Sequence, residues 1–63
     1  MTALNEGQRV YARNFHVNGT GVVVYIAPTR DREMLPVQVE MDEGDEDGHR
    51  MYRFKYSEVE AID

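Results

Sequence analysis

The sequence contains no cysteine, so no disulfide stabilises a chain of only 63 residues. It also has no run of about 20 apolar residues, which is the length that a membrane-spanning helix needs. Residues 2–7 carry neither an apolar core nor a basic flank, so we expect no signal peptide. These absences predict a small cytoplasmic protein that does not enter a membrane and that depends on side-chain packing for its stability.

Basic residues are few, with 7 Lys and Arg against 12 Asp and Glu and a net charge of −5. Such a chain is repelled by phosphate backbones, which disfavours nucleic acid as a partner. The sequence has no Ser-His-Asp arrangement, no P-loop and no dinucleotide-binding glycine motif. His16 and His49 lack metal-ligand spacing and are expected to be surface imidazoles. We therefore expect no enzyme, no metal and no cofactor.

What the sequence does contain is a series of short β-forming segments. The clearest one follows the turn-forming pair Asn18 and Gly19 and is rich in valine, isoleucine and tyrosine up to Pro28. Alternation of apolar and polar residues predicts strands at residues 8–13, 20–27, 34–41 and 49–56, with a last fragment at 61–63. Ser57 and Glu60 have the spacing of a capping box, which predicts one short 3₁₀ turn between the last two strands.

A flat sheet of this size would leave its apolar face uncovered, whereas a curled sheet covers itself. We therefore predict an all-β fold, a five-stranded, partly open antiparallel barrel that forms one domain over residues 1–63, with residues 1–7 as a lead-in. The oligomeric state stays open between a monomer and a homodimer. The expected core consists of Val10, Val22, Val24, Ile26, Val37, Val39, Phe54, Val59 and Ile62.

The order of these segments and the positions of the turns between them resemble those in a known group of domains. Residues 7–10, residues 19–23 and the sequence from Tyr52 to Glu60 resemble the small SH3-like barrels, a group that includes the KOW and Tudor domains of bacterial or phage type. The type II dihydrofolate reductases are related short chains with a Val-Gln-Ile-Tyr signature on a late strand. Here residues 51–54 read Met-Tyr-Arg-Phe, so tyrosine replaces the glutamine, which argues against reductase activity.

An acidic segment runs from Asp42 to Asp47. Glu43, Asp45 and Asp47 match the first, third and fifth positions of an EF-hand calcium loop, but the twelfth position is Phe54 where a glutamate is needed. We expect a mobile, solvated connection between two strands. Weak cation binding and an acidic patch for a partner are the alternatives.

Basic and aromatic residues alternate on two strands. Arg9, Tyr11 and Arg13 share one strand face, and Arg53 and Lys55 share another. If the first and fourth strands were neighbours, these residues would form one positive stripe of the kind that binds nucleic acids. The alternative is ion pairing across the strands, with acceptors at Glu40, Glu58 and Glu60. An aromatic cage for methylated cations is a further possibility, with candidate rings at Tyr11, Phe15, Tyr25 and Tyr52.

Phe15 is exceptional because it falls in a loop. We expect it to fold back onto the barrel end as a plug, with an exposed anchor for a partner as the alternative. The sequence thus predicts a non-catalytic module that binds an unidentified protein. Nucleic-acid binding and an acidic decoy for a basic protein are the rival functions. The expected partner-binding residues are Tyr11, Arg13, Phe15, Arg30, Arg32 and Arg53.

Overall fold

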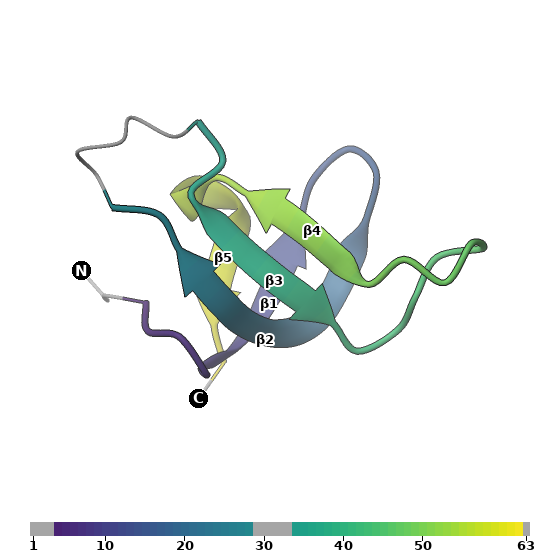
Figure 1. Ribbon diagram of the computed structural model, residues 1–63, viewed down its shortest axis with the longest axis horizontal. Coiled ribbons are helices and arrows are strands. Elements are labelled where there is room, and N and C mark those ends of the chain that lie inside the picture. Colours follow the sequence, from purple (N-terminus) through teal and green to yellow (C-terminus); the bar gives the residue numbers. More distant parts are fainter. Residues whose placement is uncertain (1–3, 29–33, 63) are drawn as a thin grey trace.

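Five strands and one 3₁₀ turn make up the structure, a computed structural model that describes residues 4–28 and 34–62 (Figure 1). The elements are β1 (Arg9–Arg13), β2 (Asn18–Ile26), β3 (Val37–Met41), β4 (Met51–Phe54), η2 (Tyr56–Glu58) and β5 (Val59–Ala61). Every pair of neighbouring strands is antiparallel, and the order across the sheet is β4-β3-β2-β1-β5. The sheet does not close on itself, so the prediction of an all-β, five-stranded, partly open barrel is confirmed.

The longest strand, β2, belongs to both halves of the barrel. Its first residues pair with β1, from Arg13 opposite Asn18 to Arg9 opposite Val22. Its later residues pair with β3, from Gly21 opposite Met41 onwards. Figure 1 shows β2 bending below β3, with β1 and β5 lying behind. The bend in this one strand is what lets the sheet cover its own apolar face.

A β-bulge lies at the bend in β2. Val23 pairs with Val39 and Tyr25 pairs with Gln38, so one extra residue, Val24, lies between two consecutive pairs of the ladder. A bulge of this kind bends the strand and shifts the alternation of its side chains by one residue. Val23 is therefore 1% exposed, whereas Val24 is 37% exposed.

The bulge corrects part of the predicted core. The prediction carried one alternation through the whole strand and placed Val22 and Val24 inside, but Val22 is only half-buried and Val24 is exposed. Beyond the bulge the prediction holds, since Ile26 packs against the core. Ile62 follows β5 and is 50% exposed, so its placement in the core was also wrong. The buried cluster consists of Val10, Ala12, Val23, Val37, Val39, Met41 and Phe54.

Gly21 lets β2 approach its paired neighbour β3 closely. A Cβ atom at this position would lie 2.5 Å from the carbonyl oxygen of Glu40 and 2.9 Å from the Cα of Met41. Real Cβ atoms do not approach backbone so closely, so glycine is required here for reasons of space.

The 3₁₀ turn η2 lies close to its predicted position but uses different residues. The backbone N–H of Lys55 donates to the Glu58 side chain at 2.8 Å, and the N–H of Glu58 donates to the Lys55 carbonyl at 3.0 Å. The predicted box between Ser57 and Glu60 is therefore shifted by two residues. The turn directs the chain into β5, which pairs with β1.

The segment before β1 is attached to the barrel. Gly7, with a φ of +90°, donates its N–H to the Val23 carbonyl at 2.6 Å, and Val23 donates to the Gln8 carbonyl at 3.0 Å. Leu4 packs against the core. The lead-in thus contributes apolar contact that the sequence did not predict.

Candidate functional site

The connection between β1 and β2, residues 14–17, is here called the Phe15 loop. Its shape is set by Asn14, whose side-chain oxygen accepts hydrogen bonds from the N–H groups of His16 at 2.8 Å and Val17 at 2.9 Å. The Asn14 N–H donates in turn to the Val17 carbonyl at 2.9 Å. Asparagine favours this geometry because its short side chain reaches the backbone two and three residues ahead. The turn therefore lies at residues 14–17, and Asn18 and Gly19 already belong to β2.

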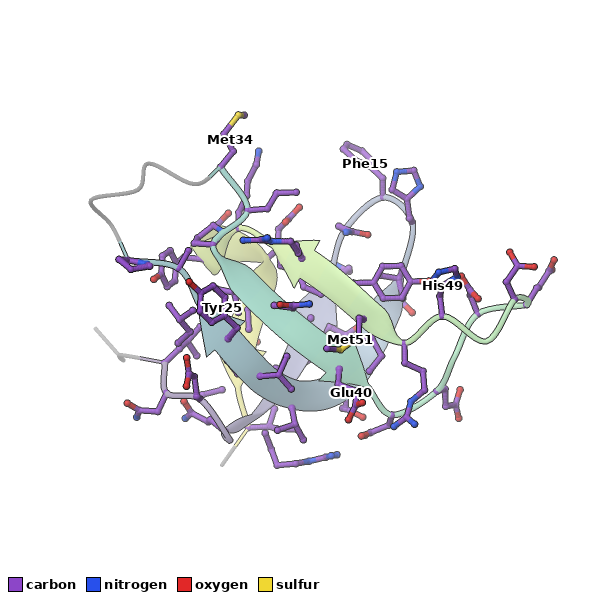
Figure 2. All side chains as sticks on the ribbon, in the orientation of Figure 1. Phe15, Tyr25, Met34, Glu40, His49 and Met51 are labelled. Atoms are coloured by element: carbon purple, nitrogen blue, oxygen red, sulfur yellow. The ribbon has the colours of Figure 1, made fainter. Side chains whose placement is uncertain are left out.

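Phe15 is 101% exposed at the tip of this loop. Figure 2 shows its ring projecting away from the barrel. The prediction that Phe15 plugs the barrel end is wrong, because the ring is fully exposed; Val17 of the same loop packs against the core. Backbone hydrogen bonds hold the loop, so the position of the ring does not depend on packing of the ring itself.

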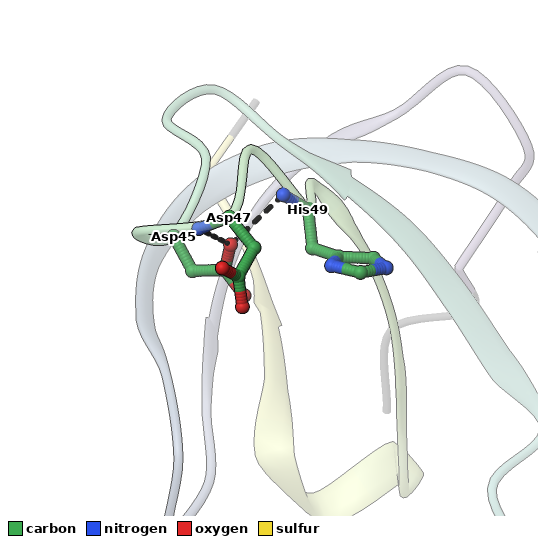
Figure 3. A group of neighbouring side chains, drawn as sticks. All are labelled: Asp45, Asp47 and His49. Atoms are coloured by element: carbon green, nitrogen blue, oxygen red, sulfur yellow. Dashed lines mark hydrogen bonds between the residues drawn. The ribbon is translucent and has the colours of Figure 1, made fainter.

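The connection between β3 and β4, residues 42–50, is here called the acidic hairpin. Its organiser is Asp45, whose Oδ1 accepts hydrogen bonds from the N–H groups of Asp47 at 2.8 Å and His49 at 2.9 Å (Figure 3). Its Oδ2 accepts a bond from the Tyr52 hydroxyl at 2.7 Å. The Tyr52 hydroxyl, followed by the two N–H groups, lowers the pKa of Asp45, and Asp45 raises the pKa of Tyr52.

Further backbone hydrogen bonds lie within the acidic hairpin, which the sequence predicted to be a solvated connection. Asp45 also donates its N–H to the His49 carbonyl at 2.9 Å, and Gly48 donates to the Asp45 carbonyl at 3.0 Å. Gly48 has a φ of +83°, which a residue with a side chain adopts at a cost. The acidic hairpin has a defined internal structure, although its side chains are exposed.

Ligand atoms of Asp45, Asp47 and His49 lie within 4.8 Å of one another in the acidic hairpin (Figure 3). All three residues are exposed, and both carboxylate oxygens of Asp45 already accept hydrogen bonds. Glu43, the first position of the calcium-like pattern, is not part of the group. Hydrogen bonds to the hairpin backbone account for the position of the Asp45 carboxylate.

Asp42 connects the start of the acidic hairpin to β1 and β2. Arg9 donates from both terminal nitrogens to its carboxylate, at 2.8 and 2.7 Å, and the Thr20 hydroxyl donates at 2.6 Å. The bond from Arg9, followed by the bond from Thr20, lowers the pKa of Asp42 from 3.8 to about 2. The negative charge of Asp42 is thus matched by Arg9.

An open hollow of about 370 Å³ lies between the Phe15 loop and the acidic hairpin. We call it the loop hollow. It is lined by Val17, Asn18, Gly19, Thr20, Met41, Asp42 and Glu43. A second hollow of about 360 Å³, the β5 hollow, is lined by Tyr11, Arg13, Ser57, Glu58 and Glu60. It brings together two predicted partner-binding residues, Tyr11 and Arg13, but surrounds them with carboxylates.

The predicted positive stripe requires β1 and β4 to be neighbouring strands, and they are not. β1 and β4 are separated by β2 and β3 in the sheet, so Arg13 and Arg53 do not lie on neighbouring strands. Arg53 donates to the Leu35 carbonyl at 2.9 Å, and Arg50 lies 3.9 Å from Glu40. Phe15 is too exposed to form the wall of an aromatic cage. Arg30 and Arg32 lie outside the described residues.

No helix in the described part of the chain is long and apolar enough to cross a membrane. Comparison with known proteins finds no family model that matches the chain, no curated protein that matches its sequence and no solved structure that matches its fold.

Proposed function

We propose that this chain is a small, non-catalytic binding module that recognises a partner protein and uses Phe15 as its apolar anchor. The observation that carries the proposal is the complete exposure of the Phe15 ring on a loop that is held by Asn14. The fold gains nothing from the ring in that position. Aromatic side chains of this kind supply much of the binding energy when they enter a pocket on a partner.

The proposed kind of barrel is SH3-like. Support comes from the strand order, from η2 directly before the last strand and from the pairing of β5 with β1. This architecture hosts many unrelated tasks, so the assignment of a function depends on Phe15 and its surroundings.

Two further features favour protein binding over the other functions considered. Neither the loop hollow nor the β5 hollow is lined by a histidine that could activate the Ser57 hydroxyl or a water molecule. The net charge of −5 and the acidic hairpin oppose contact with phosphate groups.

Affinity capture from a lysate of the source cells tests the proposal, with the wild-type chain compared with Phe15→Ala. Met34→Ala is the matched control, because it truncates another large apolar side chain that is 79% exposed. We expect the wild type and the control to retain one protein in stoichiometric amount. Phe15→Ala should retain about tenfold less, the loss expected for one anchor residue.

Thermal melting of the three proteins confirms that each remains folded. Equal retention of the same partner by the wild type and both variants would contradict the role of Phe15. Failure of the wild type to retain any protein would contradict the proposed function itself.

A further inference from the structure

The loop hollow lies directly beside the proposed anchor. Val17 lines it and is only two residues from Phe15, at most about 7 Å along the backbone, so one extended segment of a partner can reach both the Phe15 ring and the hollow. Its volume of about 370 Å³ is within the range of about 300–1,000 Å³ that is common for ligand sites. The hollow is large enough to receive one long side chain of the partner.

The apolar part of the lining suits an aliphatic stem. Val17 is half-buried against the core and presents fixed carbon surface to the hollow, whereas Met41, although it also lines the hollow, is only 2% exposed and adds little surface. Lysine and arginine side chains bury their methylene stems on such surface while their charged ends reach a polar group.

The charged part of the lining is entirely acidic. Only Asp42 and Glu43 carry charge there, and no basic side chain lines the hollow. Arg9 matches the charge of Asp42. Glu43 is exposed and makes no hydrogen bond or ion pair with residues 4–28 or 34–62, so its carboxylate is available to a partner. Glu46 and Asp47 are exposed further along the acidic hairpin and carry charge of the same sign.

We propose that the loop hollow binds a lysine or arginine side chain from a basic segment of the partner protein, next to an apolar residue of that segment that covers Phe15. This inference rests on the proposed function and adds the chemistry of the partner. Charge complementarity selects this occupant, because an acidic segment or a nucleic acid would meet Glu43, and a second copy would bring its own charge of −5.

An NMR titration of the full chain tests the inference. The probe is the acetylated and amidated hexapeptide Gly-Lys-Leu-Lys-Leu-Gly, and its control is the same peptide with glutamine in place of each lysine. We expect saturable shifts of the amide signals of Val17, Thr20 and Glu43 with the lysine peptide below about 10 mM. The glutamine peptide should produce no saturable shift.

Two charge-reversal variants locate the contact. Glu43→Lys and Glu60→Lys change the net charge equally, but Glu60 lies at the β5 hollow. We expect Glu43→Lys to weaken binding of the lysine peptide about tenfold or more, because it removes one ion pair and adds a repulsion. Glu60→Lys should weaken it by less than about twofold, the contribution of distant, screened charge.

Equal weakening by the two variants would overturn the inference, since it would mean diffuse attraction to an acidic protein, and so would equal shifts with both peptides. The proposed function fails separately. Loss of capture by Phe15→Ala, combined with no binding of the lysine peptide, would support the anchor and overturn the basic partner. Capture unaffected by Phe15→Ala would overturn the anchor, even where the hollow binds the peptide.

Discussion

The Phe15 loop and the acidic hairpin are each held in shape by one side chain, but the two side chains differ in charge. Each connects two antiparallel strands, and in each the oxygen of one side chain accepts two backbone N–H groups: Asn14 in the first, Asp45 in the second. Asn14 is neutral and holds a loop that displays an apolar ring. Asp45 is ionised, takes a third bond from Tyr52 and holds a hairpin that displays charge.

The difference teaches how each surface responds to its surroundings. The neutral side chain of Asn14 keeps its hydrogen bonds at any ordinary pH, whereas the ionised carboxylate of Asp45 becomes a weaker acceptor when it is protonated. Salt screens the charges of the acidic hairpin but has little effect on the contact area of Phe15. A partner that contacts both surfaces would therefore gain a contribution from Phe15 that is independent of pH and salt, and a contribution from the acidic hairpin that changes with both.

The largest expected effect comes from Gly21→Ala, which acts where β2 and β3 meet between the two connections. The added Cβ would overlap the Glu40 carbonyl and the Met41 Cα, so the strands must separate. We expect the free energy of unfolding to fall by about 1–3 kcal/mol, as for overpacked cores. Urea denaturation measures this, and Val24→Ala, at a half-exposed site in the same strand, is the control. Equal stability of the two variants would show that β2 can move away from β3.

A smaller effect is expected from Asn14→Ala, which removes the acceptor for two N–H groups of the Phe15 loop. We expect a loss of about 1–2 kcal/mol and faster amide hydrogen exchange at His16 and Val17. Asn14→Asp keeps the acceptor and should restore slow exchange. Unchanged exchange in Asn14→Ala would mean that the loop is held by its backbone bond alone.

Tyr52→Phe should change the pH dependence of the acidic hairpin and leave the Phe15 loop unaffected. The folded-state pKa of Asp45 is lowered, so its contribution to stability is present above the ordinary value of 3.8 and is lost as the pH falls through the folded value. Without the Tyr52 hydroxyl, which is the first cause of that shift, the pKa of Asp45 should rise towards 3.8. An NMR titration of the Asp47 and His49 amides measures it, and the His16 amide serves as the internal control. A titration that matches the wild type would contradict the bond from Tyr52.

The smallest effect on stability is expected from Phe15→Ala. Because the ring is fully exposed, its removal should change the free energy of unfolding by less than about 0.5 kcal/mol. Thermal and urea denaturation measure the difference. A loss above about 2 kcal/mol would mean that the ring packs against the protein in solution, and the proposed anchor would then be wrong.

The fold class could be predicted because alternation in β1, β3 and β4 is regular and each strand has a clear inward face. Val10, Val37, Val39 and Phe54 were placed correctly for this reason. β2 was harder, since valine occupies positions 22, 23 and 24 alike and no residue type marks the bulge. The part that Leu4 takes in the packing could not be predicted, because it depends on neighbours that are distant in the sequence.

The candidate site was only partly predictable. The position of Phe15 in a loop was a usable signal, but its exposure depends on Val17 packing against the core instead. The role of Asp45 has a local signal, an aspartate three residues before Gly48 in a polar turn, but the bond from Tyr52 requires the β4 register. The loop hollow joins residues 17–20 to residues 41–43, and only the pairing of β2 with β3 brings them together.

The sharing of β2 between the two halves of the barrel has a consequence for cooperativity. Opening either half requires the same strand to release its partners, so β1 and β3 are energetically coupled through it. The barrel should therefore unfold as one unit, and within the described residues the tips of the two connections should fluctuate most independently of it. Sequence insertions would be tolerated at those tips, whereas a break within β2 would separate the protein into two fragments that are unable to fold alone.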